Sequence, residues 1–434
     1  MLIDINYTPL LALIFFFIFL SAKYIGRVDA SFWRLNLLNI VLYRDFLIFT
    51  IVSSLYWLSY DRFKNHYVMQ ALSAEHIYYA LIASTIFMFI FYMSIYPWRL
   101  VLNSVVNKMP KINICKYIFA LKIWTWIILL LLFINYKIDP PPVVGLFQDL
   151  SALELSALRH EGSQNAVFKI LRHSWIPCTF YCWVYIYHSR QKYKLEKKLF
   201  IKLRFYVGVS LLLGIIASIW AIEKSLVASF LLGWLGIYLL ASNKKLNLKL
   251  LSLTIFVFVV TIFGFYYFLA SDVQNLDSIF EVIVNRFFAQ AAGVAYAFFA
   301  FPEIFEFKYI SGISNFLASV AGEKFSSPYA DLIKHADPVH AEISGAMSSF
   351  VAGEAYGLFG WFGVFLGPFF VAFWYGLFDV GSRNNNTAGI FVGHYGLFFG
   401  NAFMASSFYS FLWPVGFGYA MFPFVILYLL SRSK

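Results

Sequence analysis

Side chains that could bind a phosphate or move a proton gather in two long polar segments, approximately residues 137–172 and 271–346. In the first segment, the stretch from Ser151 to Arg159 is expected to form a short helix that ends at Gly162, with Arg159, His160 and Glu161 in its last turn. Arginine carries a permanent charge on a planar fork that forms paired hydrogen bonds with phosphate oxygens. Arg159 is therefore a candidate phosphate ligand, and His160 a candidate substrate contact. The alternative is a cation that completes the helix C-terminus.

The second segment places Arg286 and Gln290 one helical turn apart, so both side chains are expected on one helix face. An arginine and an amide on one face could hold a diphosphate and a sugar hydroxyl. The alternative is an interfacial helix whose arginine extends to lipid headgroups.

Further along the second segment, four potential metal ligands fall within eight residues: His335, Asp337, His340 and Glu342. Their spacing matches no common zinc motif, so we predict no metal site. A neutral His340 could instead accept a proton from a sugar hydroxyl, because the ordinary pKa of histidine lies near neutrality. The alternative for His340 is an exposed loop histidine.

Glu354 opens an apolar, glycine-rich helix, where burying an unpaired carboxylate costs several kcal/mol. It is a candidate catalytic group, and Tyr356 beside it is a candidate substrate contact. The alternative for Glu354 is a helix-start carboxylate satisfied by free N–H groups. Lys224, in a tight turn between two apolar runs, could add to a polar pocket, although a turn also solvates a charge easily.

The elements that must position these groups are membrane helices. The 434 residues are 61% hydrophobic and 13% charged, with a mean hydropathy of +0.73, whereas soluble domains average about 25% charged residues. This composition excludes a soluble multidomain enzyme and predicts one all-α membrane domain over residues 1–434. A spanning helix needs about 20 apolar residues. About eleven runs qualify: 8–22, 41–60, 77–97, 114–136, 173–189, 204–221, 225–242, 249–270, 347–378, 389–408 and 411–431.

The net charge of +11 comes from Lys and Arg in short segments between the apolar runs. The positive-inside rule explains these cations, so no nucleic-acid partner is expected. It assigns these segments to the cytoplasm, and the two long segments to the opposite side. The basic segments are 21–40, 98–113, 190–203, 243–248, 379–388 and the C-terminal tail.

Some features leave the topology open or are expected to be structural. Residues 278–301 could form a twelfth span, but polar residues interrupt their first half and favour an interfacial or re-entrant amphipathic helix. Arg44 lies near the cytoplasmic end of a span, where an arginine can extend its charge to the surface, so Arg44 and Asp45 are expected to be structural. Cys115, Cys178 and Cys182 are expected to be small core residues rather than a disulfide framework or a metal site.

Three short sequences occur in this arrangement of about eleven spans and two long loops: RHEG at 159–162, NRFFAQ at 285–290 and GEAYGLFGWFG at 353–363. The combination resembles the Wzy-type polymerases of O-antigen and capsular oligosaccharide repeat units. The resemblance implies a GT-C-type glycosyltransferase of the bacterial inner membrane with its active site facing the periplasm. Such enzymes transfer a growing glycan from undecaprenyl diphosphate onto the non-reducing end of a lipid-linked repeat unit.

By this resemblance, Arg159 and Arg286 match the essential arginines of the two periplasmic loops. His340 corresponds to an essential histidine of the related O-antigen ligases. Guanidinium groups can stabilise the charge on the departing diphosphate without a metal or cofactor. Either His340 or Glu354 would then be the base or orient the hydroxyl. A single displacement would invert the anomeric centre. The family implies a separate co-polymerase that sets chain length as a partner.

Three alternatives stay open. An O-antigen ligase would use the same donor but transfer the glycan onto lipid A-core. A lipid-linked oligosaccharide flippase or another transporter would concentrate polar groups near the bilayer midplane, whereas here they gather in the predicted loops. A non-catalytic membrane scaffold would leave the region from His340 to Glu354 unexplained.

Overall fold

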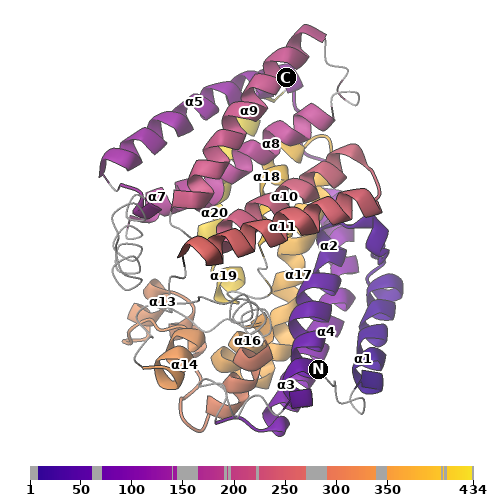
Figure 1. The fold of residues 1–434 in the computed structure, drawn as a ribbon, viewed down its shortest axis with the longest axis vertical. Coiled ribbons are helices and arrows are strands. Elements are labelled where there is room, and N and C mark those ends of the chain that lie inside the picture. Colours follow the sequence, from indigo (N-terminus) through magenta and orange to yellow (C-terminus); the bar gives the residue numbers. More distant parts are fainter. Residues whose placement is uncertain are drawn as a thin grey trace.

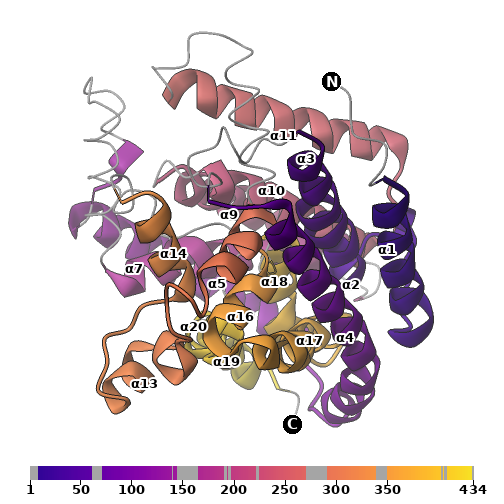
Figure 2. The same ribbon diagram turned by 90° about the horizontal axis from the view of Figure 1, so that it is seen from below.

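Helices and their connections make up the described part of the chain, as Figures 1 and 2 show. The computed structural model describes residues 8–60, 71–138, 140–143, 165–189, 193, 197–220, 224–269, 291–338, 349–401, 404 and 408–432. Within these ranges there is no strand, and the β-type pairing is an isolated bridge between Ile112 and Arg432. The described residues thus confirm the predicted all-α class.

The first half of the chain forms long helices interrupted by π-helical turns. Its elements are α1 (Thr8–Leu20), η1 (Ser21–Ile25), η2 (Phe32–Arg34), α2 (Leu37–Ile40), η3 (Val41–Val52), α3 (Ser53–Tyr60), α4 (Ala74–Asn107), α5 (Ile114–Ile138), α7 (Ala166–Ile170), η6 (Leu171–Trp175), α8 (Ile176–His188) and α9 (Lys197–Trp220).

The second half adds short helices between the long ones. Its elements are α10 (Lys224–Ser242), α11 (Leu248–Leu269), a helical segment over Ala291–Ala300, η7 (Tyr309–Gly312), α13 (Asn315–Val320), α14 (Pro328–Ala336), α16 (Val351–Phe359), α17 (Trp361–Arg383), α18 (Ala388–Gly400), α19 (Tyr409–Leu412) and α20 (Val415–Leu430).

Seven helices in the described residues are long and apolar enough to cross a membrane, so the chain is a polytopic membrane protein. They are Thr8–Ile25, Leu37–Leu58, Ala74–Asn107, Ile114–Ile138, Leu199–Trp220, Ser225–Ser242 and Trp361–Arg383. Each coincides with a predicted run, except that the run 347–378 is divided between α16 and α17. Part of α11, together with α18 and α20, forms shorter apolar helices, and the predicted number of eleven spans stays a prediction.

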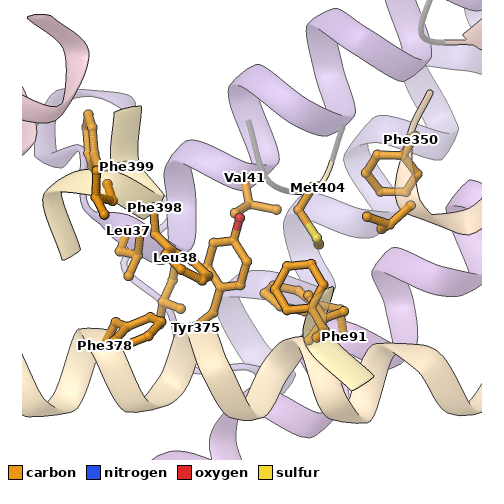
Figure 3. Close-up of a cluster of buried hydrophobic side chains, with 14 of the residues drawn as sticks. Leu37, Leu38, Val41, Phe91, Phe350, Tyr375, Phe378, Phe398, Phe399 and Met404 are labelled. Atoms are coloured by element: carbon orange, nitrogen blue, oxygen red, sulfur yellow. The ribbon is translucent and has the colours of Figure 1, made fainter. Parts of the chain in front are cut away.

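The core is centred on α4, which packs along α17, while α18 packs against α8, α10 and α17. Figure 3 shows Tyr375 of α17 with its hydroxyl directed toward Val41 and Met404. Its ring lies 5.7 Å from that of Phe91 and 5.1 Å from that of Phe398, both edge to face. Such aromatic pairs add about 0.5–1.5 kcal/mol each beyond area burial, so they bind α17 to its neighbours.

The described parts of the short basic segments lie together at one end of the bundle. We call this end the basic end. Three hydrogen bonds join its segments: Leu246 N–H to Trp33 O at 2.8 Å, Asn384 Nδ2 to Asn107 Oδ1 at 2.7 Å, and Asn113 N–H to Ser431 O at 2.8 Å. In Figure 1, α13, α14 and α16 lie at the opposite end from the C-terminus, and Figure 2 views the molecule from that side. The basic segments and the described part of the second long segment thus lie at opposite ends, as the positions of Lys and Arg predict.

The arginine at position 44 corrects one expectation. Arg44 is 9% exposed and pairs twice with the fully buried Asp45, at 2.7 and 3.0 Å, instead of extending to the surface. Its Nη1 donates to Phe399 O at 2.6 Å, and its Nη2 to Asn401 O at 3.1 Å. Because α18 ends inside the bundle, its last carbonyls need donors there, and Arg44 supplies them.

The cysteines follow the expectation in part. Cys178 and Cys182 are buried in α8, whereas Cys115 is exposed. Cys115 lies in the first turn of α5, next to the hydrogen bond that joins Asn113 to the C-terminal tail at the basic end. It is the second residue of the predicted run 114–136, and its side chain lies on the surface rather than in the core.

Candidate functional site

Most of the predicted site residues lie outside the described part of the chain: Arg159, His160, Arg286, Gln290 and His340. Lys224 begins α10, but its side chain is also outside the description. The structure therefore places two of the predicted side chains, Glu354 and Tyr356, both on α16.

The element that carries them is a broken helix. α16 ends at Gly360, whose φ of +61° and ψ of −150° lie in a region that glycine alone adopts readily. Three residues later, a Cβ on Gly363 would lie 2.0 Å from the carbonyl oxygen of Ala355. The two glycines thus allow α17 to start directly against α16. The predicted continuous span over 347–378 is therefore two helices in this structure.

Glu354 lies in the first turn of α16 and is 1% exposed. Its carboxylate accepts hydrogen bonds from the backbone N–H groups of Phe408 and Tyr409, at the start of α19. A carboxylate at a helix start is stabilised by the free N–H groups there and by the helix dipole. Glu354 therefore joins two elements that are 54 residues apart in sequence. These contacts favour a positioning role over direct contact with a substrate.

The start of α16 is held from the other side by Tyr329 of α14. The Tyr329 hydroxyl donates to Phe350 O at 2.7 Å and accepts from the N–H of Glu354. Burial and the nearby Glu354 carboxylate raise the pKa of Tyr329 well above its usual value. The hydroxyl therefore stays protonated and remains a donor at physiological pH. The short helix α14, in the second predicted loop segment, is thus fixed to the helix that carries Glu354.

Tyr356, predicted as a substrate contact, lies in an aromatic cluster and is 8% exposed. Its ring stacks on Phe298 at 4.0 Å and meets Phe307 and Trp361 edge to face at 5.6 and 5.9 Å. Phe298 belongs to the helical segment Ala291–Ala300, most of which is buried. That segment is the described part of the predicted amphipathic helix over 278–301, so its second half packs inside the protein.

A cavity of about 420 Å³ adjoins the residues that Glu354 holds. Tyr409 and Ser410 of α19 line it, together with Asn315, Phe316 and Trp413. The rings of Phe316 and Trp413 stack at 6.0 Å, forming an aromatic wall. A mostly apolar cavity with a few hydroxyl and amide groups is typical of a site for a small ligand or part of one.

Two polar contacts fix the loop that includes α14. Lys308 Nζ lies 2.6 Å from Asp331 Oδ2, and the Tyr296 hydroxyl lies 2.7 Å from His335 Nδ1. His335 is thus engaged with a neighbouring ring. Among the described residues, no group of three or more His, Cys, Asp or Glu side chains is placed to hold a metal ion. His340 and Glu342 lie outside those residues.

Sequence reasoning found Glu354 because a carboxylate in an apolar run stands out, but it missed Tyr329, Phe408 and Tyr409. Tyr329 and Tyr409 are aromatic residues in a chain that has 29 tyrosines, and Phe408 contributes only its backbone N–H. No local pattern marks such long-range partners. A tyrosine directly after the Ser327–Pro328 helix start is a weak signal for an ordered loop helix.

Comparisons with known proteins identify no relative of this chain. No family model matches it, and neither a curated protein nor a solved structure is significantly similar to it.

Proposed function

We propose that the protein is a membrane glycosyltransferase that polymerises lipid-linked oligosaccharide repeat units, as O-antigen polymerases do. In this proposal the donor is a glycan on undecaprenyl diphosphate, and the acceptor is a second lipid-linked unit. The reaction takes place at the periplasmic face of the bacterial inner membrane, away from the basic end.

The observation that carries the proposal is the arrangement around Glu354. Glu354 is buried on α16, which ends at a glycine, and its carboxyl group accepts a hydrogen bond from the backbone at the start of α19. α19 lines a cavity whose walls carry aromatic rings and hydroxyl groups. Ionisable groups inside membrane proteins are costly and usually functional. The arrangement lies in the sequence GEAYGLFGWFG, which contributes to the resemblance to the polymerases. It also lies at the end of the bundle opposite the basic loops, as a periplasmic site requires.

The proposed chemistry is a single displacement. The acceptor hydroxyl oxygen attacks the anomeric carbon, the bond from that carbon to the diphosphate oxygen breaks, and undecaprenyl diphosphate leaves with the bonding electrons. Arg159 and Arg286 stabilise the negative charge that develops on the diphosphate. His340 receives the hydroxyl proton. Glu354 is a positioning residue that keeps Tyr409 and the cavity wall in place.

The test is a glycan profile from cells in which the gene is deleted and then restored. The restored forms are the wild type, Arg159→Ala, Arg159→Lys, Arg286→Ala and His340→Ala, with Arg432→Ala at the basic end as the matched control. Protein levels in the membrane are measured for each form, so that loss of activity is separated from loss of protein.

We expect deletion to leave lipid A-core capped with a single repeat unit, and Arg432→Ala to restore the full ladder. Arg159→Ala and Arg286→Ala should not restore it. Arg159→Lys should restore it weakly, because an ammonium group lacks the planar fork. Uncapped core with accumulated lipid-linked polymer would instead identify a ligase. Unpolymerised units retained on the cytoplasmic face would identify a flippase.

A further inference from the structure

A second cavity, of about 350 Å³, opens at the basic end of the bundle. Five cationic side chains line it, against two carboxylates, which gives the lining a net charge of +3. The cations are Arg34, Arg99, Lys244, Lys245 and Arg383, and the carboxylates are Asp29 and Asp379. The cavity lies at the other end of α17 from Gly360, roughly 35 Å away for a helix of 23 residues. It is therefore separate from the site around Glu354.

One wall of the cavity is built around Asp379, whose side chain is 1% exposed. Asp379 Oδ1 lies 2.8 Å from Arg383 Nε, and Oδ2 lies 3.8 Å from Arg99 Nε. The side chains of Arg383 and Arg99 remain 47% and 28% exposed, so one buried carboxylate holds two partly exposed cationic side chains in place. Arg99 Nε is buried and has no hydrogen-bond partner among the described residues.

The opposite wall is the loop that carries Asp29 and Arg34, and Asn39 keeps it rigid. The fully buried Asn39 amide donates to the carbonyl oxygens of Asp29, Ser31 and Arg34, at 2.8, 3.1 and 2.9 Å. This loop is preorganised, because a buried side chain with three hydrogen bonds has little freedom to move.

The third side is the α10–α11 connection, which the bond from Leu246 N–H to Trp33 O joins to the Arg34 loop. It lies beside α2 in Figure 1. Lys244 and Lys245 are exposed there, and among the described residues neither lies within 4 Å of a carboxylate. The two lysines therefore carry charge that the lining does not neutralise.

We propose that this cavity binds the phosphate group of an anionic ligand at the cytoplasmic face. Guanidinium forks suit phosphate oxygens, and lysines next to them add long-range attraction. At the surface of a membrane protein, a phosphate group can belong to the headgroup of an anionic lipid or to a soluble ligand. The proposal does not depend on the polymerase activity, because the residues involved are at the other end of the molecule.

The experiment uses the full-length protein in an uncharged detergent at fixed ionic strength. Inorganic phosphate is titrated calorimetrically, and bound phosphatidylglycerol is counted by native mass spectrometry after the protein is passed through mixed micelles with phosphatidylcholine. The test variant is Lys244→Gln with Lys245→Gln. The matched control is Lys108→Gln with Lys116→Gln, which removes the same charge from exposed lysines at the same end but outside the cavity.

We expect the cavity variant to weaken binding about thirtyfold, since each lysine near a phosphate contributes about fivefold, and the control to change it less than about twofold. Loss of phosphate binding alone indicates a soluble ligand, loss of phosphatidylglycerol alone indicates a lipid headgroup, and loss of both with mutual competition indicates one site for either. All three support the cavity. Equal weakening by the control pair, or no binding of either probe to the wild type, would overturn the proposal.

Discussion

Single buried side chains of ionisable residues connect distant parts of this protein. Glu354 joins the start of α16 to the start of α19, and Arg44 joins η3 to the end of α18. In both cases a buried polar side chain satisfies backbone groups at a helix end inside the bundle. Such residues are hard to replace, because their removal leaves buried polar groups without partners.

Glu354 can be tested by two substitutions of different shape. Glu354→Gln keeps the size of the side chain and one oxygen that can accept from Phe408 N–H, whereas Glu354→Ala removes the acceptor and leaves a cavity. We expect Glu354→Ala to lower the free energy of unfolding by about 2–4 kcal/mol and Glu354→Gln to lower it by about half as much. Thermal unfolding in detergent measures both, with the exposed Glu323→Gln as the control. Equal, near-zero shifts for both Glu354 variants would contradict the positioning role.

The pair Arg44 and Asp45 predicts a difference between single and double variants. Arg44→Met leaves Asp45 buried without its partner, which should lower the free energy of unfolding by about 3–5 kcal/mol. Adding Asp45→Leu removes that stranded charge, so the double variant should be more stable than the single one. The stability that the double variant does not recover includes the lost bonds from Arg44 to the carbonyl oxygens of Phe399, Gly400 and Asn401. A double variant less stable than Arg44→Met would show that the pair is not coupled as described.

At the scale of the elements, the division between α16 and α17 shapes the candidate site. Gly360 changes the direction of the chain, and Gly363 allows the start of α17 to contact Ala355. The break places Glu354 beside α19 and Tyr356 in the aromatic cluster. The break depends on the lack of a side chain at Gly360 and Gly363.

We therefore expect that a single methyl group added at Gly363 strongly destabilises the protein. Gly363→Ala would bring a Cβ to 2.0 Å from Ala355 O, so the two helices must separate. We expect the free energy of unfolding to fall by about 1–3 kcal/mol and the packing around Tyr356 to become disordered. The control is Gly418→Ala in α20, where nothing lies within 4 Å of the added Cβ and the substitution should be neutral or slightly stabilising. Matching unfolding temperatures for the two variants would exclude a close contact at Gly363.

The sequence predicted the long helices because apolar length is a local property that a bilayer requires. The break at Gly360 was not predictable, since glycine in a membrane helix can equally serve close packing. The burial of Arg44 was missed because it depends on where α18 ends, more than 350 residues away. Glu354 was found from its own unusual position, but its partners Phe408 and Tyr409 carry no local signal.

The distribution of charge over the molecule predicts its orientation in the membrane. The described basic segments meet at one end, while Glu354 and α14 lie at the other. If the basic end faces the cytoplasm, its exposed Cys115 is out of reach from outside the membrane. Cys178 and Cys182 are buried, so among the three cysteines Cys115 is the accessible one.

This direction can be measured with a thiol reagent that does not cross membranes. We expect no labelling of the wild type in intact spheroplasts and labelling of Cys115 once the membrane is opened. The variant Glu323→Cys on a Cys115→Ser background should be labelled in intact spheroplasts, because Glu323 is exposed near α13 in the second predicted periplasmic loop. The reverse pattern would invert the predicted topology and place the candidate site on the cytoplasmic side.

In the proposed function, this chain alone joins repeat units from a lipid diphosphate donor. The most direct measurement is reconstitution of the purified protein in liposomes with lipid-linked repeat units and no nucleotide sugar, followed by mass spectrometry of the products. We expect a series of longer lipid-linked glycans, with released undecaprenyl diphosphate equal to the number of linkages formed, and no products from Arg159→Ala or Arg286→Ala. Repeat units that stay unchanged with correctly folded wild-type protein, even after the co-polymerase is added, would contradict it.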